Sequence, residues 1–369
     1  MKKVLFVLVA VVLALSAYLV LSKSKARSGG FGIGVILPLT GDGAKYGEEA
    51  KRGIELAWTL SASDKSILRY EDDQGLATVA VAAFQRLISG GDVPLVIGPM
   101  YSSTALAVAP IAERKRVVMF SPSASTPDLT AAGDYVFRNW PSDIFEGGAM
   151  AAFVYDKLKQ TNVAVLGQSL DYAMGITREF KRQYKALGGT LIAEDYYSPG
   201  TTDFRTALTK LRSAGTQCLY LPGMYAEIAL ILRQQSELGY RPLNISCVGF
   251  DNVEILTLAG NSAEGVVFAR PAFDPKGTNS AVRTFVDAFK AQFGTEPGVY
   301  AAHAYDAANI VLRAVERGGH TADGIRIALY QTKDFDGVTG RTTIDSNGDV
   351  EKTIQFMTVE QNAFVPYSK

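Results

Sequence analysis

Short apolar runs alternate along most of the chain with longer segments of helical period. The apolar runs, which we expect to be β-strands, lie at 32–37, 67–70, 95–97, 117–120, 163–166, 191–194, 218–221, 246–248 and 266–269. The expected helices lie at 48–60, 78–88, 104–113, 145–159, 172–187, 204–213, 227–238, 280–293 and 302–315. This alternation predicts an α/β fold with mostly parallel sheets that carry helices on both faces.

Two interruptions predict that the strands form two sets. A polar stretch at 138–143 divides them, and a Pro-rich stretch at 270–275 marks a return crossing. A chain of 369 residues is long enough for two cores. We therefore expect two similar lobes joined by a hinge of several strands: lobe 1 from 31–140 plus about 273–342, and lobe 2 from 141–272 plus about 343–369.

The end of the chain changes to a period of two residues. Segments 340–345 and 353–359 alternate in this way, and Asp345-Ser346-Asn347-Gly348-Asp349 lies between them. Asn-Gly is typical of tight hairpin turns, so the pattern predicts a β-hairpin.

The first 30 residues have the pattern of an export signal. Lys2 and Lys3 precede an apolar run at 4–21, and a basic segment follows at 22–27. The run is longer than the usual ~7–15 residues of a signal-peptide core and close to the ~17–25 of a membrane span. A cleaved signal peptide and a retained N-terminal anchor therefore both stay open. In either case we expect the body from Phe31 onward to be periplasmic or otherwise extracytoplasmic.

Composition narrows the possible functions. The chain has 37 basic and 37 acidic residues, with the two signs interspersed, which argues against a nucleic-acid partner. Cys218 and Cys247 both lie in apolar runs, where they are either a pair of buried thiols or a disulfide. His303 and His320 lie far from them in the sequence, so we expect no metal site, and no cofactor motif is present.

The loops after the first, third and fourth expected strands are rich in hydroxyl groups. Ligands of open parallel sheets bind at these carboxyl ends. Ser102, Ser103 and Thr126 lie at expected helix starts. Hydroxyls beside free backbone N–H groups at a helix start can bind a carboxylate, although simple N-capping would use the same residues.

These segments together resemble a known family. The motifs are Ile36-Leu37-Pro38-Leu39-Thr40-Gly41 with Tyr46-Gly47, Val96-Ile97-Gly98-Pro99 with Ser102-Ser103, Ser121-Pro122-Ser123-Ala124-Ser125-Thr126-Pro127, Tyr225-Ala226-Glu227-Ile228 and Ala304-Tyr305-Asp306-Ala307. In this order and spacing they resemble the leucine/isoleucine/valine-binding group of type I periplasmic binding proteins, from Gly32 to the end. The resemblance implies two hinged lobes that bind an amino acid in the cleft between them and deliver it to an ABC importer.

The resemblance also implies a ligand site. By matching position, the α-carboxylate of the ligand would bind Ser102, Ser123 and Ser125, with Ala124 in the same loop, and Asp251 would bind the α-ammonium. Aromatic walls would come from Tyr46, Tyr172 and Tyr300, with Met224 or Tyr225 at a further wall. Ordinary packing is the alternative for the tyrosines, and a helix cap is the alternative for Asp251. If Asp251 does not face the cleft, a carboxylate or amide without an amine would be preferred.

The sequence departs from the family at one pair of positions. The lobe 1 disulfide of branched-chain binders is missing, because the matching positions are near Gln74 and at Tyr101. Tyr101 beside the carboxylate site could alter the shape of the pocket.

An enzyme is not expected, because no nucleophile elbow, phosphate-binding loop or metalloprotease motif is present. His303 beside several alanines is more typical of a packed helix residue than of a base. The prediction is therefore a monomeric solute-binding protein that binds a small polar ligand, most simply an L-amino acid. Its partners would be the membrane subunits of an ABC importer, and only an uncleaved N-terminal segment would enter a membrane. The alternative is a ligand-sensing receptor or regulator domain for an amide, urea or aromatic acid.

Overall fold

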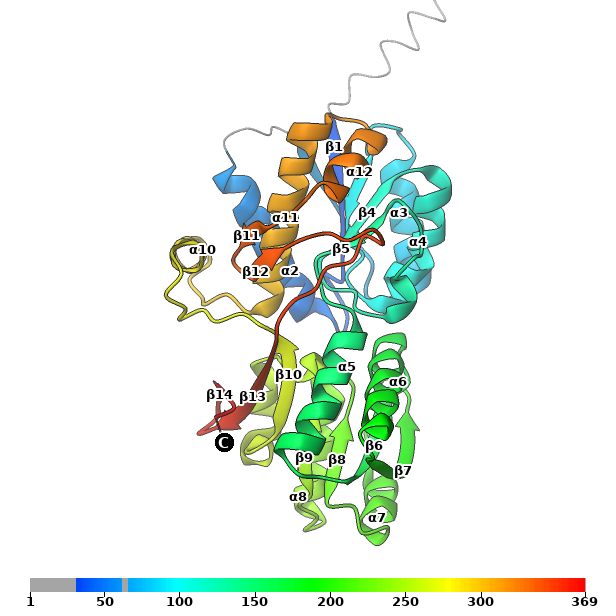
Figure 1. Cartoon of the computed structure of the whole chain (residues 1–369), viewed down its shortest axis with the longest axis vertical. Coiled ribbons are helices and arrows are strands. Elements are labelled where there is room, and N and C mark those ends of the chain that lie inside the picture. The colour runs from blue at the N-terminus through cyan, green and yellow to red at the C-terminus, as the bar shows by residue number, and fades with distance from the viewer. Residues whose placement is uncertain (1–30, 62–65, 369) are drawn as a thin grey trace, which may run out of the picture.

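The computed structural model describes residues 31–61 and 66–368, and the predicted signal or anchor lies outside these residues. Figure 1 shows two lobes, one above the other. The upper lobe, lobe 1, has a five-stranded sheet in the order β2-β1-β3-β4-β5, all parallel. Its strands are β1 (Gly32–Leu37), β2 (Ile67–Asp72), β3 (Leu95–Ile97), β4 (Val118–Ser121) and β5 (Val136–Arg138).

Helices cover both faces of this sheet because both faces of its strands are apolar. Ile36 and Val96 pack on one face against α3 (Ala77–Ile88) and α4 (Ser102–Lys115). Val35 and Ile97 belong to the cluster on the other face. That face carries α2 (Ala44–Leu60), α10 (Ser280–Phe293), α11 (Val299–Gly318) and α12 (Ala322–Tyr330). Two segments far apart in the sequence, α2 and α11, thus lie side by side (Figure 1).

The lower lobe, lobe 2, has a larger sheet in the order β14-β13-β10-β9-β8-β6-β7. Its parallel strands are β6 (Asn162–Gln168), β7 (Thr190–Tyr197), β8 (Cys218–Leu221), β9 (Leu243–Ser246) and β10 (Val267–Pro271). Its helices are α5 (Asp143–Ala152), which continues as a π-helical turn (Phe153–Lys157), α6 (Asp171–Ala186), α7 (Arg205–Ser213), α8 (Tyr225–Glu237) and α9 (Glu254–Ala259). The predicted α/β class with two sheets is confirmed.

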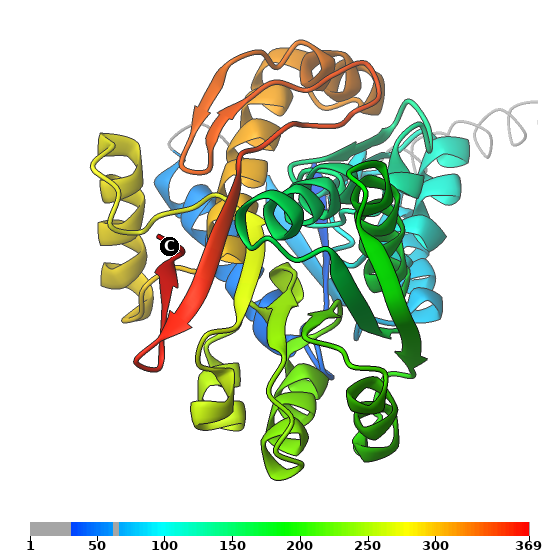
Figure 2. The same cartoon turned by 60° about the horizontal axis from the view of Figure 1, so that its bottom comes forward.

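The prediction that segments 340–345 and 353–359 form a hairpin is wrong, because the strands in these segments pair with other strands. The strand β12 (Gly340–Thr342) pairs with β11 (Phe335–Gly337), whereas β13 (Ile354–Glu360) lies antiparallel to β10 and to β14 (Ala363–Pro366), as Figure 2 shows. Between them only Ile344 and Val350 form a bridge. The expected turn at Asp345–Asp349 is present, but the chain beyond it crosses to lobe 2 and joins the sheet there.

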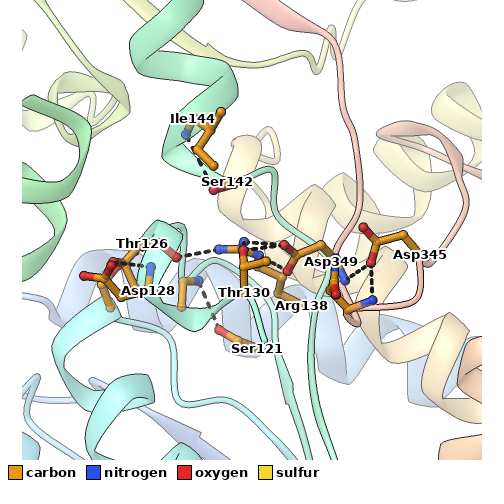
Figure 3. Close-up of polar contacts among 12 residues, drawn as sticks. Ser121, Thr126, Asp128, Thr130, Arg138, Ser142, Ile144, Asp345 and Asp349 are labelled. Carbon is orange, nitrogen blue, oxygen red and sulfur yellow. Dashed lines mark hydrogen bonds and ion pairs between the residues drawn. The ribbon is translucent and has the colours of Figure 1, made fainter. Parts of the chain in front are cut away.

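The chain crosses between the lobes three times, after β5, after β10 and before β13. Arg138 at the end of β5 holds the third crossing: its guanidinium contacts both carboxylate oxygens of Asp349 at 2.7 and 2.8 Å (Figure 3). It also donates to the Thr126 carbonyl at 2.9 Å and to the Thr130 hydroxyl at 2.8 Å. Gly348 has φ 78°, and a Cβ there would collide with the carbonyl oxygen of Val136. The close approach of this turn to β5 therefore requires glycine.

Both cysteines are free and buried, so the disulfide alternative does not hold. Burial raises the pKa of the Cys218 thiol to about 12 and that of the Cys247 thiol to about 11, which keeps both protonated. Within residues 31–61 and 66–368, no helix combines the length and the apolar character that a bilayer span needs.

Candidate functional site

A cavity of about 410 Å³ lies between the lobes, at the carboxyl ends of the parallel strands. This is within the range of about 300–1,000 Å³ that is usual for small-molecule sites. Both lobes supply its walls, because the loops after β1, β3 and β4 face the loops after β6, β7, β8 and β9. Of the predicted site residues, those that line it are Tyr46, Ser102, Ser123, Ser125, Tyr172, Tyr225 and Tyr300.

The lobe 1 wall presents the start of α4 to the cavity. Ser102 and Ser103 form its first turn, and no side chain caps this helix start in the described part of the chain. Ser102 accepts a hydrogen bond from the Thr126 backbone N–H, at 3.3 Å, which leaves its own hydroxyl proton available. Free N–H groups and the positive end of the helix dipole make this turn suitable for a carboxylate.

The neighbouring loop after β4 offers a ligand fewer free hydrogen-bond donors than expected. The Ser123 hydroxyl donates to the Met100 carbonyl at 2.8 Å, so its proton is already used. Ala124 does not line the cavity: it is buried, and its N–H donates to the Ser121 hydroxyl at 3.0 Å. The sequence-based expectation for Ala124 is therefore corrected, because this loop folds back onto β4 at that residue.

Six aromatic residues form the other walls: Tyr46, Tyr101, Trp140, Tyr172, Tyr225 and Tyr300. Four of them are in ring contact: the ring of Tyr46 lies 4.8 Å from that of Tyr300 and 5.7 Å from that of Tyr225, and Trp140 stacks on Tyr300 at 5.2 Å. Trp140 was missed, although its place in the polar stretch between the lobes was a usable signal.

The lobes touch each other across the cleft. The Tyr46 hydroxyl of lobe 1 donates to the Gly249 carbonyl of lobe 2 at 2.9 Å. Two ion pairs also join the lobes: Lys45 with Glu254 at 3.0 Å, and Arg178 with Asp128 at 3.0 Å. The structure is therefore a closed arrangement of the two lobes.

Asp251, the expected ammonium partner, does not lie on the cavity wall. It follows a short 3-10 helix (Val248–Phe250), and its carboxylate pairs with Arg270 at 2.8 Å. The two side chains are only 8% and 10% exposed, so the charge of Asp251 is compensated inside lobe 2. Val248 lines the cavity instead. The sequence could not show this, because the pairing depends on β10 lying beside the loop.

Glu227 is an acidic residue of the cavity wall that was not among the predicted site residues. It lies in the first turn of α8, directly after the β8 loop, and its residue is 7% exposed. One carboxylate oxygen accepts the Gly200 backbone N–H at 2.9 Å. Its place after the carboxyl end of a strand was the signal that could have identified it.

Two further carboxyl groups are buried behind the cavity wall, at the start of α5. Asp143 and Glu146 are at most 1% exposed, and Glu146 accepts the Val248 N–H at 2.9 Å. Burial raises the pKa of Asp143 to about 7 and holds that of Glu146 well above its usual range. His303 is also fully buried, against Trp140, and burial lowers its pKa to about 3, as for a packed helix residue.

Two hinged α/β lobes that close on a cavity of this kind define the class of two-lobed solute-binding proteins. The sequence profile of the family described as periplasmic binding protein matches residues 31–363. The chain belongs to this family, and the resemblance seen in the sequence is confirmed.

The chain is similar to several named members. It is 31% identical over 327 residues to the "Leu/Ile/Val-binding protein homolog 3" of Brucella melitensis, covering 86% of this chain and 88% of that protein. The crystal structure of a leucine-binding protein, LivK, of Thermotoga maritima superposes with a TM-score of 0.87 at 31% identity, covering 91% of this chain and 97% of that one. LivJ of Streptococcus pneumoniae in complex with isoleucine gives 0.84 at 28% identity, with the same coverage.

Proposed function

We propose that this protein is the extracytoplasmic solute-binding component of an ABC importer and that it binds an L-amino acid, branched-chain or related, in the interlobe cleft. The observation that carries the proposal is the cavity itself, in which the uncapped start of α4 faces aromatic walls from both lobes. Similar proteins named for leucine, isoleucine and valine, one of them solved with isoleucine, support this ligand class. The membrane subunits of the importer would receive the ligand.

The mechanism that follows is capture on lobe 1 and closure by lobe 2. A ligand carboxylate would bind at Ser102, and the lobe 2 rings of Tyr172 and Tyr225 would then cover it. A ligand favours closure only by the contacts that the closed form adds.

A thermal-shift screen tests the ligand class. Protein freed of endogenous ligand by unfolding and refolding is titrated with L-amino acids, amides, urea and aromatic acids. A ligand at ~100 times its dissociation constant should add roughly 2.7 kcal/mol to the free energy of unfolding. We expect stabilisation by leucine, isoleucine or valine. Stabilisation by amides or aromatic acids alone would contradict the amino-acid proposal and leave solute binding in place; no response to any compound would favour a sensor.

Tyr46→Phe tests the closure step. The variant loses the hydrogen bond from Tyr46 to Gly249 that only the closed form makes, so we expect ligand affinity to fall roughly 2- to 12-fold. Calorimetric titration measures the affinity, and solution scattering with and without ligand measures closure.

Tyr240→Phe is the matched control. Its hydroxyl donates to the Thr216 carbonyl at 3.0 Å inside lobe 2, away from the cavity, so its loss should lower stability without changing affinity. Equal affinities for Tyr46→Phe and wild type, or scattering profiles that superimpose with and without ligand, would count against closure.

A further inference from the structure

The cavity wall carries negative charge without any positive side chain. Among the described residues it includes the carboxylates of Asp42, Asp171 and Glu227 and no Lys, Arg or His. Asp42 and Asp171 are exposed to solvent, which screens them, whereas Glu227 is buried. Among the charged side chains of the wall, Glu227 is therefore the buried one.

One hydrogen bond positions the Glu227 carboxylate without pairing it with a cation. It accepts the Gly200 N–H, and in the part of the chain that the structure describes no Lys, Arg or His forms an ion pair with it. A carboxylate can accept about four hydrogen bonds, and buried charges in proteins are generally paired. Glu227 thus retains acceptor capacity at the cavity wall, and a ligand cation would pair with it.

The aromatic walls are an independent observation that points to the same chemistry. The hydroxyls of three of the rings are held on lobe 2: Tyr46 donates to Gly249, Tyr225 to Glu254 at 2.9 Å and Tyr300 to Val248 at 3.4 Å. These three residues and Trp140 line the cavity. Aromatic ring faces attract cations and have no comparable attraction for anions.

Asp251 is not free to bind a ligand ammonium, since its carboxylate is paired with Arg270. Loss of this residue from the cavity would by itself favour a carboxylate or amide without an amine. The buried carboxylate of Glu227 argues for the opposite preference, because an anion without an amine would face this carboxylate and, among the described residues, no Lys, Arg or His of the wall could bind it.

We propose that Glu227 binds a cationic nitrogen of the ligand and that the cleft selects organic ammonium compounds over anions of the same shape. The inference rests on the proposed function in that an L-amino acid would be the zwitterionic form of such a ligand. It assigns the ammonium to the start of α8 instead of the loop after β9.

Calorimetric titration of the full chain, freed of endogenous ligand, tests the proposal with three probes that share the isobutyl group of leucine. L-Leucine carries both charges, isocaproate lacks the amine, and isoamylamine lacks the carboxylate. We expect isocaproate to bind about 100-fold more weakly than leucine, since a charge-assisted hydrogen bond and its ion pair are lost. This comparison uses the wild-type protein and does not depend on how any variant folds.

Glu227→Gln then assigns the effect to one residue. Glutamine keeps an acceptor oxygen for Gly200 and removes the charge, so affinity for leucine should fall about 10- to 100-fold while that for isocaproate does not fall. Glu264→Gln is the matched control: its carboxylate also accepts backbone N–H groups, from Gln361 and Asn362, but lies outside the cavity wall, and its loss should leave affinity unchanged.

The outcomes separate this inference from the proposed function. Leucine bound equally by wild type and Glu227→Gln would overturn the role of Glu227 and leave amino-acid binding intact, and isocaproate bound as tightly as leucine would overturn the charge selection. Isoamylamine bound through Glu227 without leucine binding would support the inference and contradict the amino-acid function. Failure of all three probes to bind would contradict both.

Discussion

Replacing Arg138 with methionine is expected to lower the free energy of unfolding by roughly 3–5 kcal/mol, the usual cost of breaking a buried ion pair from one side. Arg138 is completely buried, and Asp349 is 15% exposed. The variant leaves the Asp349 carboxylate and the Thr126 carbonyl without their guanidinium donors at the place where two crossings between the lobes meet. Chemical denaturation with a two-state fit measures the loss.

A double variant separates the charge from the packing. Arg138→Met with Asp349→Asn removes the uncompensated carboxylate as well, so part of the lost stability should return. Arg205→Met is the control for an exposed pair, since Arg205 and its partners Asp203 and Glu237 are at least half exposed, and it should cost no more than about 1 kcal/mol. Equal losses for Arg138→Met and Arg205→Met would refute a special role for the buried pair.

Asp143→Asn should stabilise the protein above neutral pH and have little effect near pH 4. The folded-state pKa of Asp143 is raised to about 7, first by burial, so folding favours the neutral carboxyl. Its stabilising effect is complete below the unfolded pKa of about 4 and is lost as the pH rises through about 7. At pH 8 the difference between variant and wild type should reach roughly 4 kcal/mol, because the carboxyl ionises near pH 7 in the folded state and near pH 4 in the unfolded state.

The charged groups around Asp143 define the controls. Arg138 and Arg178 lower its pKa, whereas Glu179 raises it, and Asp143 in turn raises the pKa of Glu146. Denaturation curves from pH 4 to pH 8 should therefore be compared for wild type, Asp143→Asn and Asp287→Asn, an exposed acid on α10. If Asp143→Asn follows the wild-type pH profile as closely as Asp287→Asn does, the carboxyl of Asp143 does not titrate as described.

Much of the fold was predictable because each central strand is buried on both faces and therefore appears as an apolar run. The strand β5 (Val136–Arg138) was missed, since it is short and continues directly into the polar crossing. The hairpin prediction was wrong for a different reason, because a period of two residues indicates strands but not the strands with which they pair. The Asp345 carboxylate stabilises the turn by accepting the N–H groups of Asn347 and Asp349. The side chain of Asp349 in turn pairs with Arg138 of lobe 1.

The site was predicted best where a residue's place after a strand determines where it points. The serines at the start of α4 line the cavity for this reason, as do Tyr46, Tyr172 and Tyr225, each on a helix that follows a strand. Tyr300 also lines it, but from the start of α11, which follows a helix. Asp251 and Ala124 do not, because contacts formed within their own lobes decide their orientation. Whether the residues that line the cavity bind the ligand stays a prediction that the titrations above address.

The pairing of α2 with α11 constrains the order in which the molecule can assemble. The five strands of lobe 1 are complete at Arg138, yet the face that carries α2 lacks α10, α11 and α12 until the chain has passed through the parallel strands of lobe 2. The sheet of lobe 2 is likewise incomplete until Ile354–Glu360 pairs with β10. Because the contacts that complete each lobe join distant parts of the chain, folding is expected to be slow compared with a helical bundle. A lobe 1 that forms before α11 is in place would therefore leave the apolar side of α2 open to proteases and to aggregation.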